Sequence, residues 1–336
     1  MSKSPEQLLY SALFCLSFLF FFQGCSGFSH LTAVDAEQHI GPTSADCGKC
    51  HGKQYREWQG SAHNLAWTDP LYLEATDEYD DDSCFSCHIP GSIFDKQLRA
   101  RSYNRDEGVS CVSCHLNNGA MYGPHDASGL VTPHPVQPDT NFFKSSALCG
   151  ICHQATYSSW QENVAGQQNT QVRQCQQCHM SLVKRTATQG TNIFSRLLVS
   201  FEKQHQVRSH TIVLSHMADF PGAVKITMQQ TAPFRLSITN QLPHDLPGGE
   251  FMASAIELFI FPVKKNPATG ASKAILVCDT DSPLVPGQTR QLTLQTDSFG
   301  HTLAPDTTYT VQLILRQAKK NQQLQLAQTT LTTNSK

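Results

Sequence analysis

Five copies of the pattern Cys-x-x-Cys-His lie within residues 47–179 of this 336-residue sequence. With 13 cysteines and 15 histidines, the product 336 × (13/336)² × (15/336) gives roughly 0.02 such strings by chance. Two cysteines at this spacing can each form a thioether to one vinyl group of haem, and the next histidine is then held under the iron as its proximal ligand. The cysteine pairs are Cys47 and Cys50, Cys84 and Cys87, Cys111 and Cys114, Cys149 and Cys152, and Cys175 and Cys178, and the histidines that follow them are His51, His88, His115, His153 and His179.

Zinc ribbons or a disulfide framework are the alternative explanation of these paired cysteines. A tetrahedral zinc site needs two Cys-x-x-Cys pairs, so five pairs would leave one over. Neither zinc nor a disulfide requires a histidine at the same offset in every copy. The pattern therefore predicts five covalently attached c-type haems (haem c).

The N-terminal residues are typical of an export signal. Residues 1–24 carry Lys3 and then an apolar run over 8–22 that is too short for a comfortable membrane span. Export agrees with the haem interpretation, because c-type haem is attached outside the cytoplasm. Residues 22–25 (Phe-Gln-Gly-Cys) resemble a bacterial lipobox, although Phe and Gln replace the usual Leu and small residue. We expect either a lipid anchor to the membrane on Cys25 or an ordinary cleavage site close by.

Two domains that differ in composition and sequence pattern follow this leader. Residues 30–200 hold every motif, with helical patterns over 54–67 and 145–161 and a Gly-, Pro- and Asn-rich stretch over 117–140 that predicts a loop. This domain should consist mostly of helices and loops packed around haem. Residues 201–336 alternate apolar and polar side chains, which predicts an antiparallel, Ig-like β-sandwich and an α+β chain overall. The expected strands cover 222–230, 233–240, 254–263, 273–279, 289–296, 308–317 and 322–332.

The sixth ligand of each iron decides what such haems can do. A second histidine saturates the iron, which suits electron transfer, whereas a missing one leaves a place for substrate. Ten histidines lie outside the motifs, enough for five bis-histidine haems. The formal net charge of −2 and the pI of about 6.7 give no sign of nucleic-acid binding.

Four stretches carry a resemblance to a known family: 47–67, Gly108–His115, Leu148–His153 and Gln174–Met180. They resemble the multihaem cytochromes related to the tetrahaem cytochrome that accepts electrons from hydroxylamine oxidoreductase, and to octahaem reductases. The resemblance covers residues 45 to about 250. It implies multihaem electron transfer outside the cytoplasm.

The resemblance also nominates sixth ligands. His125 and His39 compete for a fifth place. Because His125 lies nine residues before His134 in the same loop, we expect one of these two to be a ligand and the other a solvent-exposed neighbour. The nominated residues, each with the string that carries the resemblance, are His63 (Trp-x-x-Ser-x-His), His134 (after Tyr-Gly-Pro), His210 (Arg-x-His-Thr) and His244 (Pro-His-x-x-Pro-Gly-Gly, where relatives have Gly-His-x-x-Pro-Thr-Gly).

The first functional hypothesis is an exported electron carrier, periplasmic or anchored at the outer membrane or cell surface. Its partners would be other extracytoplasmic redox proteins, either cytochromes or a quinol-linked donor. The second is an enzyme that acts on small nitrogen or sulfur species at one open haem. All five motifs end in His rather than Lys, the mark of one reductase family, which counts against this enzyme. The third is a subunit of a surface cytochrome assembly.

Overall fold

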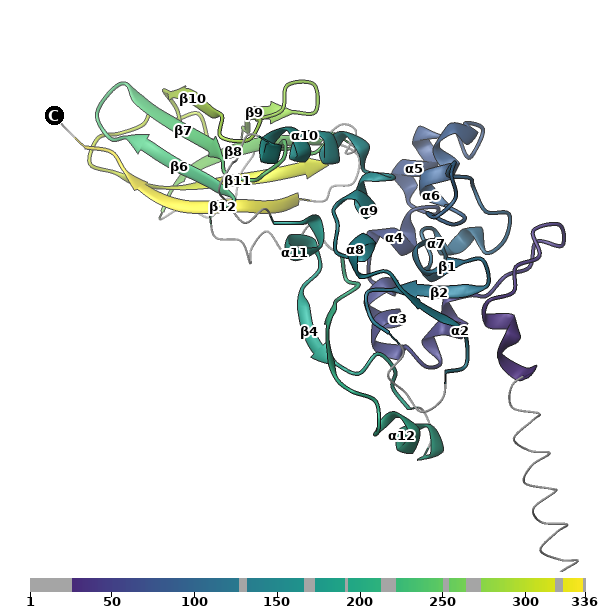
Figure 1. Cartoon of the computed structure of the whole chain (residues 1–336). Coiled ribbons are helices and arrows are strands. Elements are labelled where there is room, and N and C mark those ends of the chain that lie inside the picture. Colours follow the sequence, from purple (N-terminus) through teal and green to yellow (C-terminus); the bar gives the residue numbers. More distant parts are fainter. Residues whose placement is uncertain are drawn as a thin grey trace, which may run out of the picture. The chain divides into compact units, whose positions relative to one another are not determined.

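The computed structural model describes residues 26–126, 132–165, 173–190, 193–212, 222–249, 254–263, 273–317 and 323–334 (Figure 1). The expected signal peptide and Cys25 lie outside these residues. The chain divides into two compact units. The first contains residues 1–145 and 176–212, and the second contains residues 146–175 and 213–336.

The first unit consists of short helices joined by loops. Its helices are η1 (Ser26–Leu31), α2 (Ser44–Gly48), α3 (Gly52–Gln59), α4 (Ala62–Leu65), α5 (Pro70–Ala75), η2 (Asp82–Cys84), α6 (Phe85–His88), η3 (Arg105–Glu107), α7 (Cys111–His115), α8 (Thr140–Phe143) and α12 (Ile193–Val199), and α11 (Cys175–His179) begins at its boundary. The expected single helix over 54–67 is wrong, because Gly60 ends α3 and Ser61 begins α4. The Ser61 hydroxyl donates to the carbonyl of Trp58, which stabilises this break.

Two small sheets complete the first unit. β1 (Leu116–Asn117) pairs antiparallel with β2 (Ala120–Gly123), which pairs parallel with β3 (Val136–Pro138). The expected loop over 117–140 therefore contains short strands where it is described. β4 (Leu182–Arg185) pairs antiparallel with β5 (His205–Arg208), with Leu182 opposite Arg208.

Apolar packing in the first unit is limited to small clusters among the described residues. One cluster is built on Trp67, Tyr72 and Ile89, and another on Tyr103, Val112 and Leu116. Arg101 lies between the loops, only 4% exposed, and its guanidinium donates to main-chain carbonyls and to the Ser113 hydroxyl. The accepting carbonyls belong to Pro90, Tyr103, Asn104 and Gly108.

Where it is described, the second unit contains two helices and two antiparallel sheets. α9 (Ala147–Gly150) and α10 (Gln154–Ala165) replace the single helix expected over 145–161, with a break at 151–153. One sheet has the order β10-β7-β6 and the other β12-β11-β8-β9 (Figure 1). The strands are β6 (Val224–Gln229), β7 (Phe234–Asn240), β8 (Ser254–Pro262), β9 (Ile275–Asp279), β10 (Thr289–Leu294), β11 (Thr308–Gln317) and β12 (Gln323–Thr332). All seven expected strands are confirmed.

Alternating side chains of both sheets form one core. In β7, Phe234, Leu236, Ile238 and Asn240 are buried, and the residues between them are more exposed. They join a cluster that includes Ile256 and Leu258 of β8 and Val311 and Leu313 of β11. Cys278 lies in this core, 1% exposed, and packs there as a small apolar side chain.

Candidate haem sites

Each Cys-x-x-Cys-His motif lies on a turn of helix. In the first motif the amide of His51 donates to the carbonyl of Cys47 at 2.8 Å, and in the fourth the amide of His153 donates to that of Cys149 at 2.9 Å. The second, third and fifth motifs end in α6, α7 and α11. On a helical turn, residues three apart share a face. Both thiols of a motif can therefore reach one haem.

Three proximal histidines have Nδ1 fixed by a main-chain carbonyl. Nδ1 of His51 donates to Ala187 at 2.8 Å, that of His88 to Ala66 at 2.6 Å, and that of His115 to Tyr122 at 2.7 Å. Metal-bound histidines almost always donate their second ring nitrogen in this way, which fixes the tautomer and leaves Nε2 free for the metal. Burial also lowers the pKa of His115, which favours the neutral ring that a metal requires.

Two expected sixth ligands lie near proximal histidines of the first unit. The ring centres of His51 and His134 are 6.4 Å apart, and those of His115 and His210 are 6.2 Å apart. With a metal–nitrogen bond of about 2 Å and about 1.1 Å from nitrogen to ring centre, two imidazoles on opposite sides of one iron have centres about 6 Å apart. The two pairs fit this spacing.

The His210 ring has a further property of a metal ligand. Its Nδ1 is buried and has no hydrogen-bond partner within the described part of the chain. Burial lowers the pKa of His210 to about 4, so the imidazole is neutral at neutral pH. A buried, unpartnered ring nitrogen is costly unless something satisfies it. The arrangement of thiols, proximal rings and opposing rings fits covalently bound haem.

The other nominated histidines occupy different settings. His244 donates from Nδ1 to the carbonyl of Asp245 at 2.8 Å, and half-buried His63 lies on α4. His125 stacks on His205 with ring centres 4.9 Å apart, closer than two ligands of one iron would be. Exposed His39 lies in a turn with φ of 56°.

The second motif lies beside an aromatic cluster. The ring of His88 stacks on Tyr72 with centres 4.0 Å apart and planes at 14°. The ring centre of Trp67 lies 4.2 Å from that of Tyr79 and 4.9 Å from that of Phe85. Burial raises the pKa of Tyr72, so its hydroxyl stays protonated. A haem held by the second motif would lie beside this apolar cluster.

The motifs form two close pairs. The thiol of Cys47 is a hydrogen-bond partner of Cys111, and that of Cys149 is a partner of Cys175. In both pairs, a serine lies three residues before the first cysteine of the earlier motif. Its hydroxyl accepts a hydrogen bond from a backbone amide of the later motif. Ser44 Oγ accepts from the Cys111 amide at 3.4 Å, and Ser146 Oγ accepts from the Cys175 amide at 2.9 Å. The first motif is thus joined to the third, and the fourth to the fifth.

The two pairs are copies of one structural repeat. Residues 44–51 and 146–153 share the string Ser-Ala-x-Cys-Gly-x-Cys-His, and a tyrosine and a tryptophan follow at the same offsets. A Cβ on Gly48 would lie 2.6 Å from the Tyr55 ring, and one on Gly150 would lie 2.5 Å from the Tyr157 ring. The shared string is visible in the sequence.

The tryptophans tie each repeat to its partner motif. Trp58 Nε1 donates to the carbonyl of Val109 at 2.8 Å, and Trp160 Nε1 donates to that of Arg173 at 3.1 Å. Each of these carbonyls lies two residues before the first cysteine of the partner motif. The equivalent tryptophan therefore joins the two motifs of the pair in both repeats.

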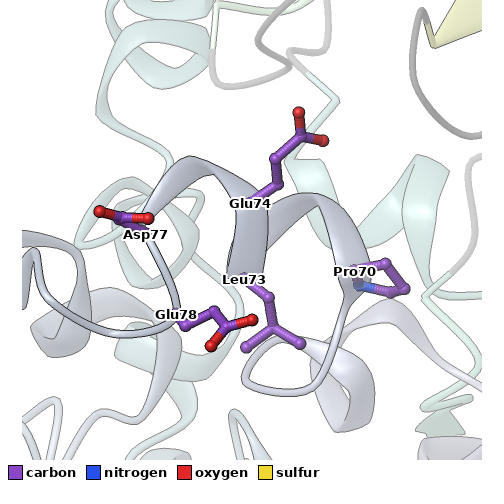
Figure 2. Close-up of a pocket in the computed structure, with 5 residues that line it drawn as sticks. All are labelled: Pro70, Leu73, Glu74, Asp77 and Glu78. Atoms are coloured by element: carbon purple, nitrogen blue, oxygen red, sulfur yellow. The ribbon is translucent and has the colours of Figure 1, made fainter.

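Two surface hollows in the first unit are separate from these sites. One, of about 380 Å³, lies beside α5 and is lined by Pro70, Leu73, Glu74, Asp77 and Glu78 (Figure 2). The other is lined by Asp95, Lys96, Gln97 and Arg99. Neither lining includes a cysteine or histidine of a motif.

A family model matches part of the chain. Residues 46–116, which contain the first three motifs, match the family model described as cytochrome c554 and c-prime. No curated protein sequence matches the chain. In the described part of the structure, no helix combines the length and apolar character needed to cross a membrane. The family match, with the motif geometry, supports a c-type cytochrome that binds haem covalently.

Proposed function

We propose that the protein carries five covalently bound c-type haems and conducts electrons between extracytoplasmic redox partners. The observation that carries this proposal is the spacing of the ring pairs, 6.4 Å for His51 and His134 and 6.2 Å for His115 and His210. An iron with two imidazole ligands has no position left for substrate, so it exchanges electrons only.

In this proposal the irons are mostly bis-histidine. His134 is the sixth ligand of the haem held by His51, and His210 that of the haem held by His115. His63 and His244 serve two of the remaining haems. His125 and His39 are weaker candidates, because one stacks on His205 and the other is exposed in a turn.

The paired motifs suggest how electrons move inside the chain. The hydrogen-bonded thiols of Cys47 and Cys111 are attachment points of two different haems, and so are those of Cys149 and Cys175. The first and third haems would be neighbours, as would the fourth and fifth. The small apolar clusters of the first unit agree with a core that the haems themselves complete.

For the second unit we propose an Ig-like β-sandwich. Its sheets contain the first, second and fifth strands, and the fourth, third, sixth and seventh strands. The Ig fold divides its strands in nearly this way, with the fourth strand on the other sheet in the constant type. The loop that carries His244 leaves β7 of this unit. The protein would be exported and held at the periplasmic side or the cell surface, with Cys25 as lipid anchor, and its partners would be cytochromes or a quinol-linked donor.

The test is a haem count combined with spin-state spectroscopy. The intact mass of the purified protein should exceed that of the chain by five haems. EPR of the oxidised protein should be low-spin throughout, and carbon monoxide should not shift the ferrous spectrum. A high-spin component near one haem per chain, with a carbon monoxide adduct, would contradict the simple carrier and favour catalysis at an open haem. A component that disappears on self-association would instead favour a surface assembly.

A further inference from the structure

Two side chains at equivalent positions of the repeat contact the loops of two expected sixth ligands. Glu57 stands immediately before Trp58, and Ser159 immediately before Trp160. Each therefore occupies the same place relative to its Cys-x-x-Cys-His motif. Each accepts a main-chain hydrogen bond from a histidine loop of its own unit.

Glu57 binds the loop of His210. Its Oε2 accepts the backbone N–H of His210 at 3.0 Å. Both carboxylate oxygens also accept from Arg185, at 2.6 Å from Nη1 and 2.8 Å from Nη2. Arg185 is 8% exposed, so water screens this bidentate pair weakly. The carboxylate thereby joins α3, the end of β4 and the residue two beyond β5.

Ser159 binds the loop of His244 through its hydroxyl group. Its Oγ accepts the backbone N–H of Asp245 at 2.9 Å and donates to Oδ1 of the same residue at 2.8 Å. The carbonyl of Asp245 in turn accepts from Nδ1 of His244. Ser159 therefore fixes the peptide that orients the His244 ring. Asn240 supports the loop from its other end by donating to the carbonyl of His244 at 2.9 Å.

A loop ligand needs such an anchor more than a motif histidine does. The proximal histidines are held by two thioethers and a helical turn, whereas His210 and His244 lie outside helices and strands. Partners of metal ligands commonly change metal affinity or activity by about 10- to 100-fold when they are removed. We propose that Glu57 and Ser159 are positioning residues that hold the sixth haem ligands His210 and His244 at their irons. This inference rests on the proposed function.

The first experiment uses EPR of the oxidised holoprotein with Glu57 changed. Glu57→Ala should convert one low-spin haem in five to high-spin and create one carbon monoxide site. Glu57→Gln keeps an oxygen that can accept the His210 N–H, so it should stay low-spin. It should nevertheless raise the reduction potential of one haem, because the Arg185 charge is no longer neutralised. Glu162→Gln, an exposed carboxylate on α10, is the matched control and should change neither property.

The second experiment uses the other repeat. Ser159→Ala should weaken the low-spin signal of one haem, and Ser159→Thr, which restores a hydroxyl, should recover it. Ser158→Ala is the control, because Ser158 is the exposed neighbour on the same helix. If Glu57→Ala fails to fold, Glu57→Gln and Ser159→Ala still decide the question.

Two different results would overturn the proposed ligation and the proposed positioning roles. A wild-type protein with a high-spin, carbon monoxide-binding haem held by His115 contradicts the proposed ligation itself. A wholly low-spin wild type whose Glu57→Ala and Ser159→Ala variants are equally low-spin, with unchanged potentials, overturns only the positioning roles.

Discussion

His115 and His210 lie with ring centres 6.2 Å apart, although their positions differ by 95 residues in the sequence. His115 is fixed by its motif and by the Tyr122 carbonyl. His210 comes from the segment after the fifth motif, at the end of the β4–β5 hairpin. One iron between these rings would join the two segments, and removal of His210 would open that iron.

His210→Ala should therefore expose one iron without loss of haem. We expect one haem in five to become high-spin and bind carbon monoxide, and added imidazole should restore the low-spin spectrum by filling the vacant position. His134→Ala should act in the same way on a different haem, so that the double variant shows two. His301→Ala, on an exposed loop side chain, is the control. An unchanged spectrum in His210→Ala would contradict the assignment.

Among the cationic side chains described in the first unit, we expect substitution of Arg101 to lower the free energy of unfolding most. Its guanidinium makes five hydrogen bonds to buried acceptors, and Arg101→Met leaves those acceptors unpaired. We expect a loss of about 3 kcal/mol in the free energy of unfolding, measured by urea unfolding followed at the haem absorbance. Arg99→Ala, at an exposed position, should change the urea midpoint little. Equal midpoints for the two variants would show that the Arg101 network contributes nothing.

The glycines inside the first and fourth motifs should not tolerate a methyl group. A Cβ on Gly48 or Gly150 would overlap a tyrosine ring, so each alanine variant must displace that ring at a cost of about 1–3 kcal/mol. Gly123→Ala is the matched control, because a Cβ there meets nothing within 4 Å. Thermal unfolding of the three variants tests this prediction. Destabilisation by only one of the two motif variants would argue against equivalence of the repeats.

The helix that carries the first motif should lose stability in acid through Asp46. Hydrogen bonds from Lys49 and Thr43 lower the pKa of Asp46 from 3.8 to about 2. A depressed pKa stabilises the folded state fully above pH 3.8, and this contribution is lost as the pH falls through about 2. Asp46→Asn should remove that part of the pH dependence. The check is the difference in unfolding midpoint between the wild type and the variant, measured at pH 6 and at pH 2. This difference should be smaller at pH 2.

Local patterns predicted much of the fold. The strand segments were readable because alternation of side chains matches the two faces of a strand, as in Phe234–Asn240. The helix breaks at Gly60-Ser61 and at 151–153 could not be predicted from the sequence. Each break depends on where a motif or a capping residue interrupts a helical pattern. The five Cys-x-x-Cys-His motifs were fully readable, since each is defined by five consecutive residues, and haem attachment at each of them stays a prediction.

The contacts between distant segments could not be read in the same way. Nothing near Glu57 in the sequence indicates Arg185 or His210, and nothing near His51 indicates His134. These contacts depend on how loops close over long separations, which residue spacing does not encode. Of the nominated sixth ligands, the structure brings His134 and His210 near proximal rings, and it does not show this for His63, His244, His125 and His39 in the part of the chain that it describes. The ligation of all six stays a prediction.

The carbonyl that orients His51 has a consequence for how the protein matures. That acceptor, Ala187, lies in a turn whose amides at Ala187 and Thr188 donate to the Glu202 carboxylate. A chain that has been synthesised only as far as His179 already carries all five Cys-x-x-Cys-His motifs, yet it lacks Ala187 and Glu202. Attachment of a haem at His51 can thus precede completion of the surroundings of that ring, which must wait until the chain has been synthesised as far as Glu202.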